Sequence, residues 1–81
     1  MAKFVIMSSD SQLGDYYTGT WYIYQGERYG NFCRHYRREE AKVYKTEAGA
    51  NRAVEMLEGF ANTYDGELTV VDITNLKGWE I

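Results

Sequence analysis

Alternating hydrophobic and polar positions in the first half of the chain predict three short strands, at residues 3–8, 16–25 and 31–36. Successive side chains of a strand point to opposite faces, so a period of two indicates β-structure. Gly26 and Gly30 bracket a polar stretch between the second and third strands. That placement predicts a hairpin turn, and therefore an antiparallel sheet.

The second predicted strand distributes its aromatic side chains over two faces. One face carries Tyr17, Trp21 and Ile23, and the other carries Tyr16, Thr18, Thr20, Tyr22 and Tyr24. We expect the face with Trp21 and Ile23 to be buried. The opposite face then presents a row of tyrosines and threonines to solvent, where such residues favour strand and can pair across it.

A helical period replaces the strand period after Thr46. Thr46 is placed as an N-cap, because its hydroxyl can accept from a free N–H group of the first turn. The apolar stripe of the helix consists of Ala50, Ala53, Val54, Leu57, Phe60 and Ala61. This spacing of three and four residues is typical of one buried helix face, and we expect the helix to end at Gly59 or near Asn62.

The remaining elements complete an α+β fold. Residues 42–45 predict a short edge strand, Asp65 and Gly66 a turn, and residues 67–74 a last strand. The order β-β-β-(β)-α-β predicts a small antiparallel sheet of four to five strands packed on one helix, in a single domain of residues 1–81. One helix covers one face, so we expect the other face to stay open unless a partner or a second copy covers it. The tail contains Trp79 and Ile81, whose side chains are poorly suited to water.

Aromatic and arginine residues gather in the middle of the chain. Nine of the thirteen aromatic residues and four of the five arginines fall within residues 16–44. Tyrosine, tryptophan and arginine dominate the energetics of protein interfaces. Net charge is −2 for residues 1–27, +4 for residues 28–45 and −5 for residues 46–81. The local excess of positive charge predicts a partner surface that is acidic or bears phosphate.

Composition excludes several classes of protein. The longest apolar run near the N-terminus, residues 4–7, is too short for a signal peptide or a membrane span. Cys33 and His35 are the only cysteine and histidine. An internal disulfide is therefore impossible, and a zinc site of the Cys/His type lacks ligands. We expect a cytoplasmic protein that uses neither cofactor nor metal.

Candidate catalytic groups are few. Cys33 and His35 are two residues apart on a predicted strand, so a small enzyme with a thiolate and imidazolium pair is one hypothesis. The carboxylate pairs are Glu39 with Glu40 and Asp10 with Asp15. No orienting residue or oxyanion motif accompanies the Cys33/His35 pair, and neither carboxylate pair lies in a metal-binding or glycosidase pattern. We therefore expect no enzymatic activity.

A basic-aromatic strip interleaves cations with rings. It comprises Arg28, Tyr29, Arg34, His35, Tyr36, Arg37 and Arg38. Such a strip can stack nucleobases, which makes a nucleic-acid-binding module the alternative function. A protein partner is our main expectation, and a homodimer is possible. The predicted partner-binding residues are Tyr16, Tyr22, Tyr24, Arg28, Tyr29, Arg34, Tyr36, Arg37 and Arg38.

Several features spread over most of the chain resemble those of a known class of proteins. Residues 41–54 place a Lys-Thr helix start before an alanine-spaced helix, residues 3–6 read Lys-aromatic-Val-Ile, and Trp21 lies in the second strand. With residues 68–73, these features resemble the small accessory proteins of bacteriophages and prophages. The resemblance implies a protein that binds and blocks a host machine in the host cytoplasm, as anti-CRISPR and other anti-defence inhibitors do. The Tyr/Arg segment at residues 22–38 is longer than the hairpin such proteins have, and a specific function is expected there.

Overall fold

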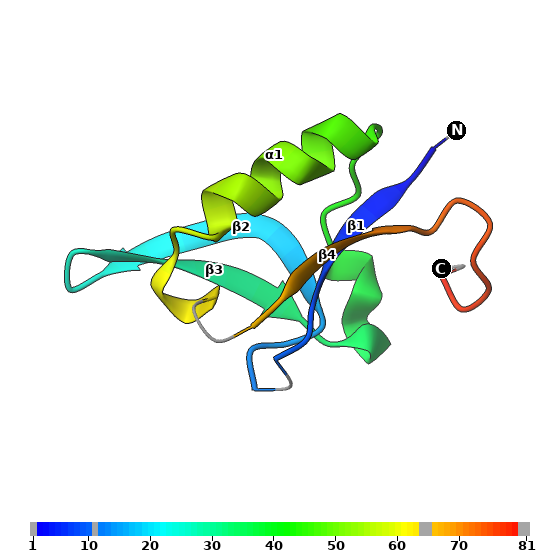
Figure 1. The fold of residues 1–81 in the computed structure, drawn as a ribbon. Coiled ribbons are helices and arrows are strands. Elements are labelled where there is room, and N and C mark those ends of the chain that lie inside the picture. The colour runs from blue at the N-terminus through cyan, green and yellow to red at the C-terminus, as the bar shows by residue number, and fades with distance from the viewer. Residues whose placement is uncertain (1, 11, 64–65, 80–81) are drawn as a thin grey trace.

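The computed structural model describes residues 2–10, 12–63 and 66–79, and it is an antiparallel sheet with one main helix (Figure 1). The strands are β1 (Phe4–Ser8), β2 (Tyr16–Tyr24), β3 (Glu27–Cys33) and β4 (Leu68–Asp72), and the helix is α1 (Glu47–Leu57). Two 3₁₀ helices, η1 (His35–Glu40) and η2 (Ala61–Thr63), lie in the connections. The strands are arranged in the order β3-β2-β1-β4. The predicted α+β class and the order β-β-β-α-β are confirmed. None of the helices within the described ranges has the length and apolar character needed to span a bilayer.

β1 and β2 pair at one end and then separate. Met7 lies opposite Tyr16, and beyond this pair residues 42–44 occupy the space between the two strands. The Lys42 N–H donates to the Tyr17 carbonyl at 2.9 Å, and Tyr44 exchanges two backbone hydrogen bonds with Phe4. The predicted edge strand at 42–45 is therefore a single bridge, and it lies inside the sheet rather than at its edge.

The hairpin of β2 and β3 extends past the end of α1 (Figure 1). Its two-residue turn has positive φ at Gln25 (52°) and Gly26 (81°), as a type I′ turn requires. Near the base, Tyr17 pairs with Phe32 and Trp21 with Gly30, so residues 18–20 of β2 bulge opposite Asn31. The predicted strand at 31–36 is wrong in its bounds, because β3 begins directly after the turn and ends at Cys33.

α1 begins at the predicted N-cap. The Thr46 hydroxyl accepts a hydrogen bond from the Gly49 N–H at 3.0 Å, and the helix ends at Leu57, just before Gly59. Leu57 and Phe60 from the predicted stripe pack with Ile6 and Tyr17 into one hydrophobic cluster. This cluster fixes α1 against the face of the sheet on which Tyr17 lies.

The opposite face has a second hydrophobic cluster at its base. Val5, Tyr16, Cys33 and Ile73 are buried there, with Ala41, Val71 and Trp79 packed against them. After β3 the chain turns into η1 on this side, and Trp79 meets the Tyr16 ring edge-on, with ring centroids 4.7 Å apart. The expectation that this face stays open is therefore wrong at the base of the sheet. Ile81 and the Asp65 half of the predicted turn lie outside the described residues.

Candidate interaction surface at the hairpin tip

Three tyrosines form a cluster on the hairpin, on the side away from α1. The rings of Tyr22 and Tyr29, a cross-strand pair, are stacked with centroids 5.4 Å apart and planes 14° apart. Tyr24 meets Tyr29 edge-on at 6.3 Å and 67°. Tyr22 is 49% exposed and Tyr24 is 59% exposed. We call Tyr22, Tyr24 and Tyr29 the tyrosine cluster; all three are among the predicted partner-binding residues.

The hairpin backbone and a hydrogen bond from Gln25 position the tyrosine cluster. The type I′ turn matches the twist of the two strands and fixes their register. Gln25 donates from Nε2 to the Tyr24 phenol at 3.3 Å. Because the rings are already stacked in the free chain, little side-chain entropy remains to be lost on binding.

A polar patch adjoins the tyrosine cluster toward the base of the hairpin. It consists of Thr18, Thr20 and Asn31, the residues of the bulge and its partner. The two threonine hydroxyls are 2.8 Å apart, and Asn31 donates from Nδ2 to Thr20 at 3.0 Å. The Thr18 hydroxyl also contacts the Asn31 carbonyl at 3.1 Å. Period two in the sequence predicted both threonines on this face, but no motif in the sequence indicated a role for them.

Trp21 and Ile23 lie on the α1 side, as predicted, but they are not buried. Trp21 is 43% exposed, although its ring meets the Phe60 ring edge-on at 5.6 Å, and Ile23 is 66% exposed. The eleven residues of α1 span about 16 Å, whereas the nine residues of β2 span about 30 Å. The helix is too short to cover the hairpin tip, and the predicted burial of these two residues is wrong for that reason.

Tyr16 was predicted to be an exposed binding residue and is buried, with 7% of its surface accessible. Its phenol is 2.7 Å from Nδ1 of His35, and the backbone N–H of His35 donates to Asp15 at 2.8 Å. Burial, followed by the charge of Asp15, raises the pKa of Tyr16 above its ordinary value. The side of the sheet was predicted correctly, but η1 and Trp79 cover this end of it. Tyr16 is therefore a core residue.

The predicted arginines do not gather around the tyrosine cluster. Arg28 lies on the α1 side of the hairpin, since it pairs with Ile23, and its guanidinium stands 5.0 Å from the centre of the Phe60 ring. Arg34 precedes η1, and Arg37 and Arg38 lie within it. β3 has seven residues, so Arg28 and Arg34 are separated by about 20 Å along the strand.

Both arginines of η1 already make contacts within the chain. Arg37 forms an ion pair with Glu40 at 2.5 Å, and Arg38 donates from Nη1 to the His35 carbonyl at 3.1 Å. Tyr36 is 76% exposed beside them. The basic-aromatic strip is thus divided between two faces and two ends of β3, and it is not one continuous surface.

Cys33 is poorly suited to nucleophilic chemistry. The thiol is buried, and burial, followed by the charge of Glu40, raises the pKa of Cys33. A nucleophilic cysteine needs a lowered pKa. His35 lies beyond the end of β3 and shares its Nδ1 with Tyr16, so the predicted same-face pair on one strand does not exist.

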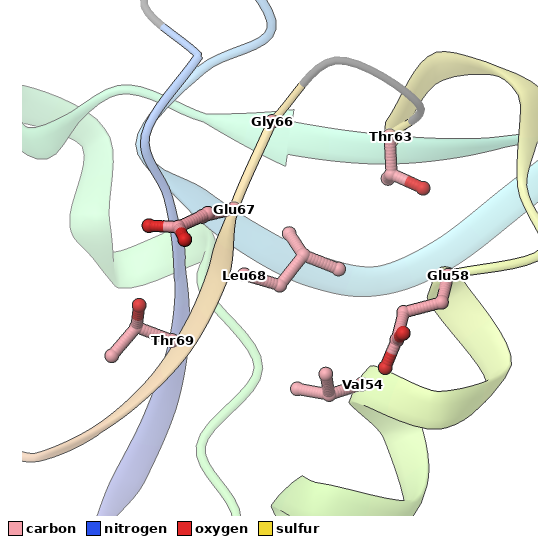
Figure 2. A pocket seen from close by; sticks show the side chains of 7 residues that line it. All are labelled: Val54, Glu58, Thr63, Gly66, Glu67, Leu68 and Thr69. Atoms are coloured by element: carbon pink, nitrogen blue, oxygen red, sulfur yellow. The ribbon is translucent and has the colours of Figure 1, made fainter.

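A hollow of about 460 Å³ lies between the end of α1 and the start of β4 (Figure 2). Val54 and Glu58 reach it from the helix and Leu68 from the strand, while the side chains of Glu67 and Thr69 turn to the other side of β4. The Thr63 hydroxyl donates hydrogen bonds to the carbonyls of Leu57 and Phe60. Among these lining residues, only Glu58 directs a carboxylate into the hollow, so they supply no pair of groups for acid/base catalysis.

The chain was compared with protein-family models, with curated proteins and with solved structures, and none of the three comparisons gave a match.

Proposed function

We propose that the chain is a non-catalytic module that binds a protein partner through the tyrosine cluster and the adjoining polar patch. The observation that carries this proposal is the arrangement of Tyr22, Tyr29 and Tyr24 as a preformed stack at the exposed end of a hairpin. Tyrosine supplies large, rigid contact area with a polar end, and neighbouring threonine and asparagine side chains supply adaptable hydrogen bonds. That combination is typical of surfaces that recognise proteins.

A protein partner fits this surface better than a nucleic acid. Residues 16–26 contain no charged side chain, whereas phosphate contacts need several lysines or arginines beside the rings. The nearest arginine, Arg28, faces the opposite side of the hairpin, and Arg37 is paired with Glu40. Glu27, the cross-strand partner of Tyr24, adds an exposed carboxylate on the side of the tyrosine cluster. The expected partner surface is therefore weakly polar, with a neutral or basic group near Glu27, rather than the acidic or phosphate-bearing one inferred from local charge.

The proposal extends to inhibition of a host machine by a protein encoded in a phage or prophage. This part rests on the resemblance of residues 3–6, 41–54 and 68–73 to phage accessory proteins. It also implies that the chain acts in the cytoplasm of a host cell. The binding surface does not depend on this origin.

The test is capture of a partner from an extract of the source cells, with the tagged chain and two variants. The triple variant Tyr22→Ser, Tyr24→Ser and Tyr29→Ser removes the tyrosine cluster. The control, Tyr36→Ser, removes the most exposed tyrosine of the described chain from η1. Circular dichroism checks that both variants fold, because lost cross-strand pairs cost about 0.2–1 kcal/mol each.

The wild-type chain and the control should retain the same protein, and the triple variant should lose it. Retention of that protein by the folded triple variant would contradict the proposal. Capture that is abolished by nuclease treatment would favour the nucleic-acid alternative instead.

A further inference from the structure

The outer edge of β2 is open over the length of the hairpin tip. β1 pairs with β2 through Met7 and Tyr16, and the Lys42 N–H is bonded to Tyr17 one residue further on. The Lys42 side chain then packs against Gly19. Within the described ranges, no strand pairs with this edge of β2 at residues 20–24. An open edge offers a row of backbone donors and acceptors to another strand.

The hydrogen bonds of Gly30 show which backbone groups face outward. Gly30 bonds to Asn62 through both its N–H and its carbonyl, on the side of β3 away from β2. Trp21 is the Cα partner of Gly30, so the two residues form a non-hydrogen-bonded pair. The residues of a non-hydrogen-bonded pair direct their N–H and carbonyl groups away from each other. Trp21, and Ile23 two residues further, therefore point their backbone groups out from the free edge of β2.

The tip of this edge lacks the usual protection against pairing. Proteins blunt open edges with charged side chains, proline or β-bulges; residues 21–24 contain no charge and no proline, and the bulge at residues 18–20 and the Lys42 side chain lie toward the base of the hairpin. The other end of the sheet, β4, differs. It is bracketed by Glu67 and Asp72, in a segment of residues 46–81 with a net charge of −5. Two copies joined at β4 would bring like charges together, whereas two copies joined at β2 would not.

We propose that the occupant of the β2 edge is a second copy of this chain, paired antiparallel about a two-fold axis at Tyr22. Trp21 of each copy then lies opposite Ile23 of the other and exchanges both backbone hydrogen bonds with it. The two sheets join into one, with both α1 helices on the same side. Such an interface is isologous and closed, so it stops at a dimer.

The side chains are complementary in this register. Trp21 packs beside Ile23 of the second copy on the α1 side, which pairs two side chains that are exposed in the single chain. Tyr24 comes opposite Thr20 of the second copy, on the side away from α1 where the tyrosine cluster lies.

The dimer also brings the two tyrosine clusters together. Tyr22 of each copy becomes the neighbour of Tyr22 of the other, so the two clusters form one continuous aromatic surface on the side away from α1. This inference goes beyond the proposed function, because a partner protein can bind the tyrosine cluster of a single chain.

Sedimentation equilibrium tests the dimer. Because the paired edge is short, the series should run from about 10 μM to about 1 mM. The apparent mass of the wild-type chain should rise from 9.4 kDa toward twice that value. Ile23→Pro should stay monomeric, because the proline lacks the outward N–H yet removes no hydrogen bond to β3. The matched control, Ile23→Thr, keeps the N–H and should still associate. A wild-type chain that remains monomeric throughout the series would overturn the proposal.

Amide hydrogen exchange of the wild-type chain tests the same edge without a substitution. The amides of Trp21 and Ile23 should exchange about tenfold more slowly when nine-tenths of the chains are dimeric, since exchange then requires the monomer. The Arg28 amide faces the opposite edge of the same hairpin and serves as the internal control. A dimer in which Trp21 and Ile23 exchange as fast as in the monomer would show that it forms elsewhere and would overturn the proposal.

Discussion

The side-chain amide of Asn62 hydrogen-bonds both backbone groups of Gly30, accepting from its N–H at 3.0 Å and donating to its carbonyl at 2.6 Å. Asn62 thus occupies the place of a further strand at the outer edge of β3. Its segment, η2, follows the end of α1 and brings the amide to that edge. The same hairpin therefore has one edge capped by a side chain at Gly30 and one edge open at residues 20–24.

Replacing Asn62 with alanine should destabilise the fold. Gly30 is buried, so its N–H and carbonyl would lose their partners where water has poor access. We expect the free energy of unfolding to fall by about 1–3 kcal/mol, measured by urea denaturation. Asn75→Ala alters an exposed asparagine and is the control. Equal stability of the two variants would contradict the structural role of Asn62.

Stability at high pH should depend on Tyr16. Burial raises the pKa of Tyr16 above the ordinary value of about 10. The stabilisation due to this shift is therefore complete below pH 10 and is lost as the pH rises through the folded-state value. Burial also raises the pKa of Tyr17. The free energy of unfolding should decline above pH 10.

The variant Tyr16→Phe separates the contribution of the Tyr16 phenol to this pH dependence from the contributions of the other tyrosines. At neutral pH the variant should be about 1 kcal/mol less stable than the wild type, because the contact with His35 is lost. Above pH 10 the difference should shrink, since the variant lacks the titrating phenol. Urea denaturation at several pH values measures this, with the exposed Tyr36→Phe as control. A difference that stays constant across the whole range would contradict the assigned burial.

The turn offers a stabilising substitution. Gln25 adopts a φ of 52°, in the left-handed region where a long side chain is disfavoured and asparagine is preferred. Gln25→Asn should raise the free energy of unfolding by about 0.5 kcal/mol, and Gly26→Ala should lower it by about 1 kcal/mol. Thermal denaturation of both variants checks the turn type. A fall in stability with Gln25→Asn would argue against a type I′ turn.

The sequence predicted the elements better than it predicted burial. Thr46 and the apolar spacing of α1 define the helix through local chemistry, and the N-cap and the stripe from Ala50 to Leu57 were confirmed. Phe60 and Ala61, also assigned to the stripe, follow the end of α1, although Phe60 is buried in the same cluster. Period two likewise placed Trp21 on the α1 side. Period two shows which face of a strand a side chain lies on, but it does not show how far along the strand the helix extends. The predicted helix is shorter than the second predicted strand, and this difference in length was the available indication that the helix does not reach Ile23.

Burial on the sheet face away from α1 depends on contacts between distant parts of the chain. Tyr16 is buried because η1 follows β3 and because Trp79 returns from the end of the chain. Neither contact leaves a local pattern in the sequence. The basic-aromatic strip is not one surface, because Arg28 lies at the start of β3 and Arg34 follows its end, and because the chain then turns into η1 with the other two arginines of the strip.

The most direct test of the tyrosine cluster is a footprint on the chain itself. The partner retained by the wild-type chain is added to a sample with isotope-labelled tyrosine rings, and the ring resonances of the eight tyrosines are followed by NMR. The account predicts that Tyr22, Tyr24 and Tyr29 shift or broaden, while Tyr36, although more exposed than Tyr22 or Tyr24, does not. Changes at Tyr36 with an unaltered tyrosine cluster would contradict it.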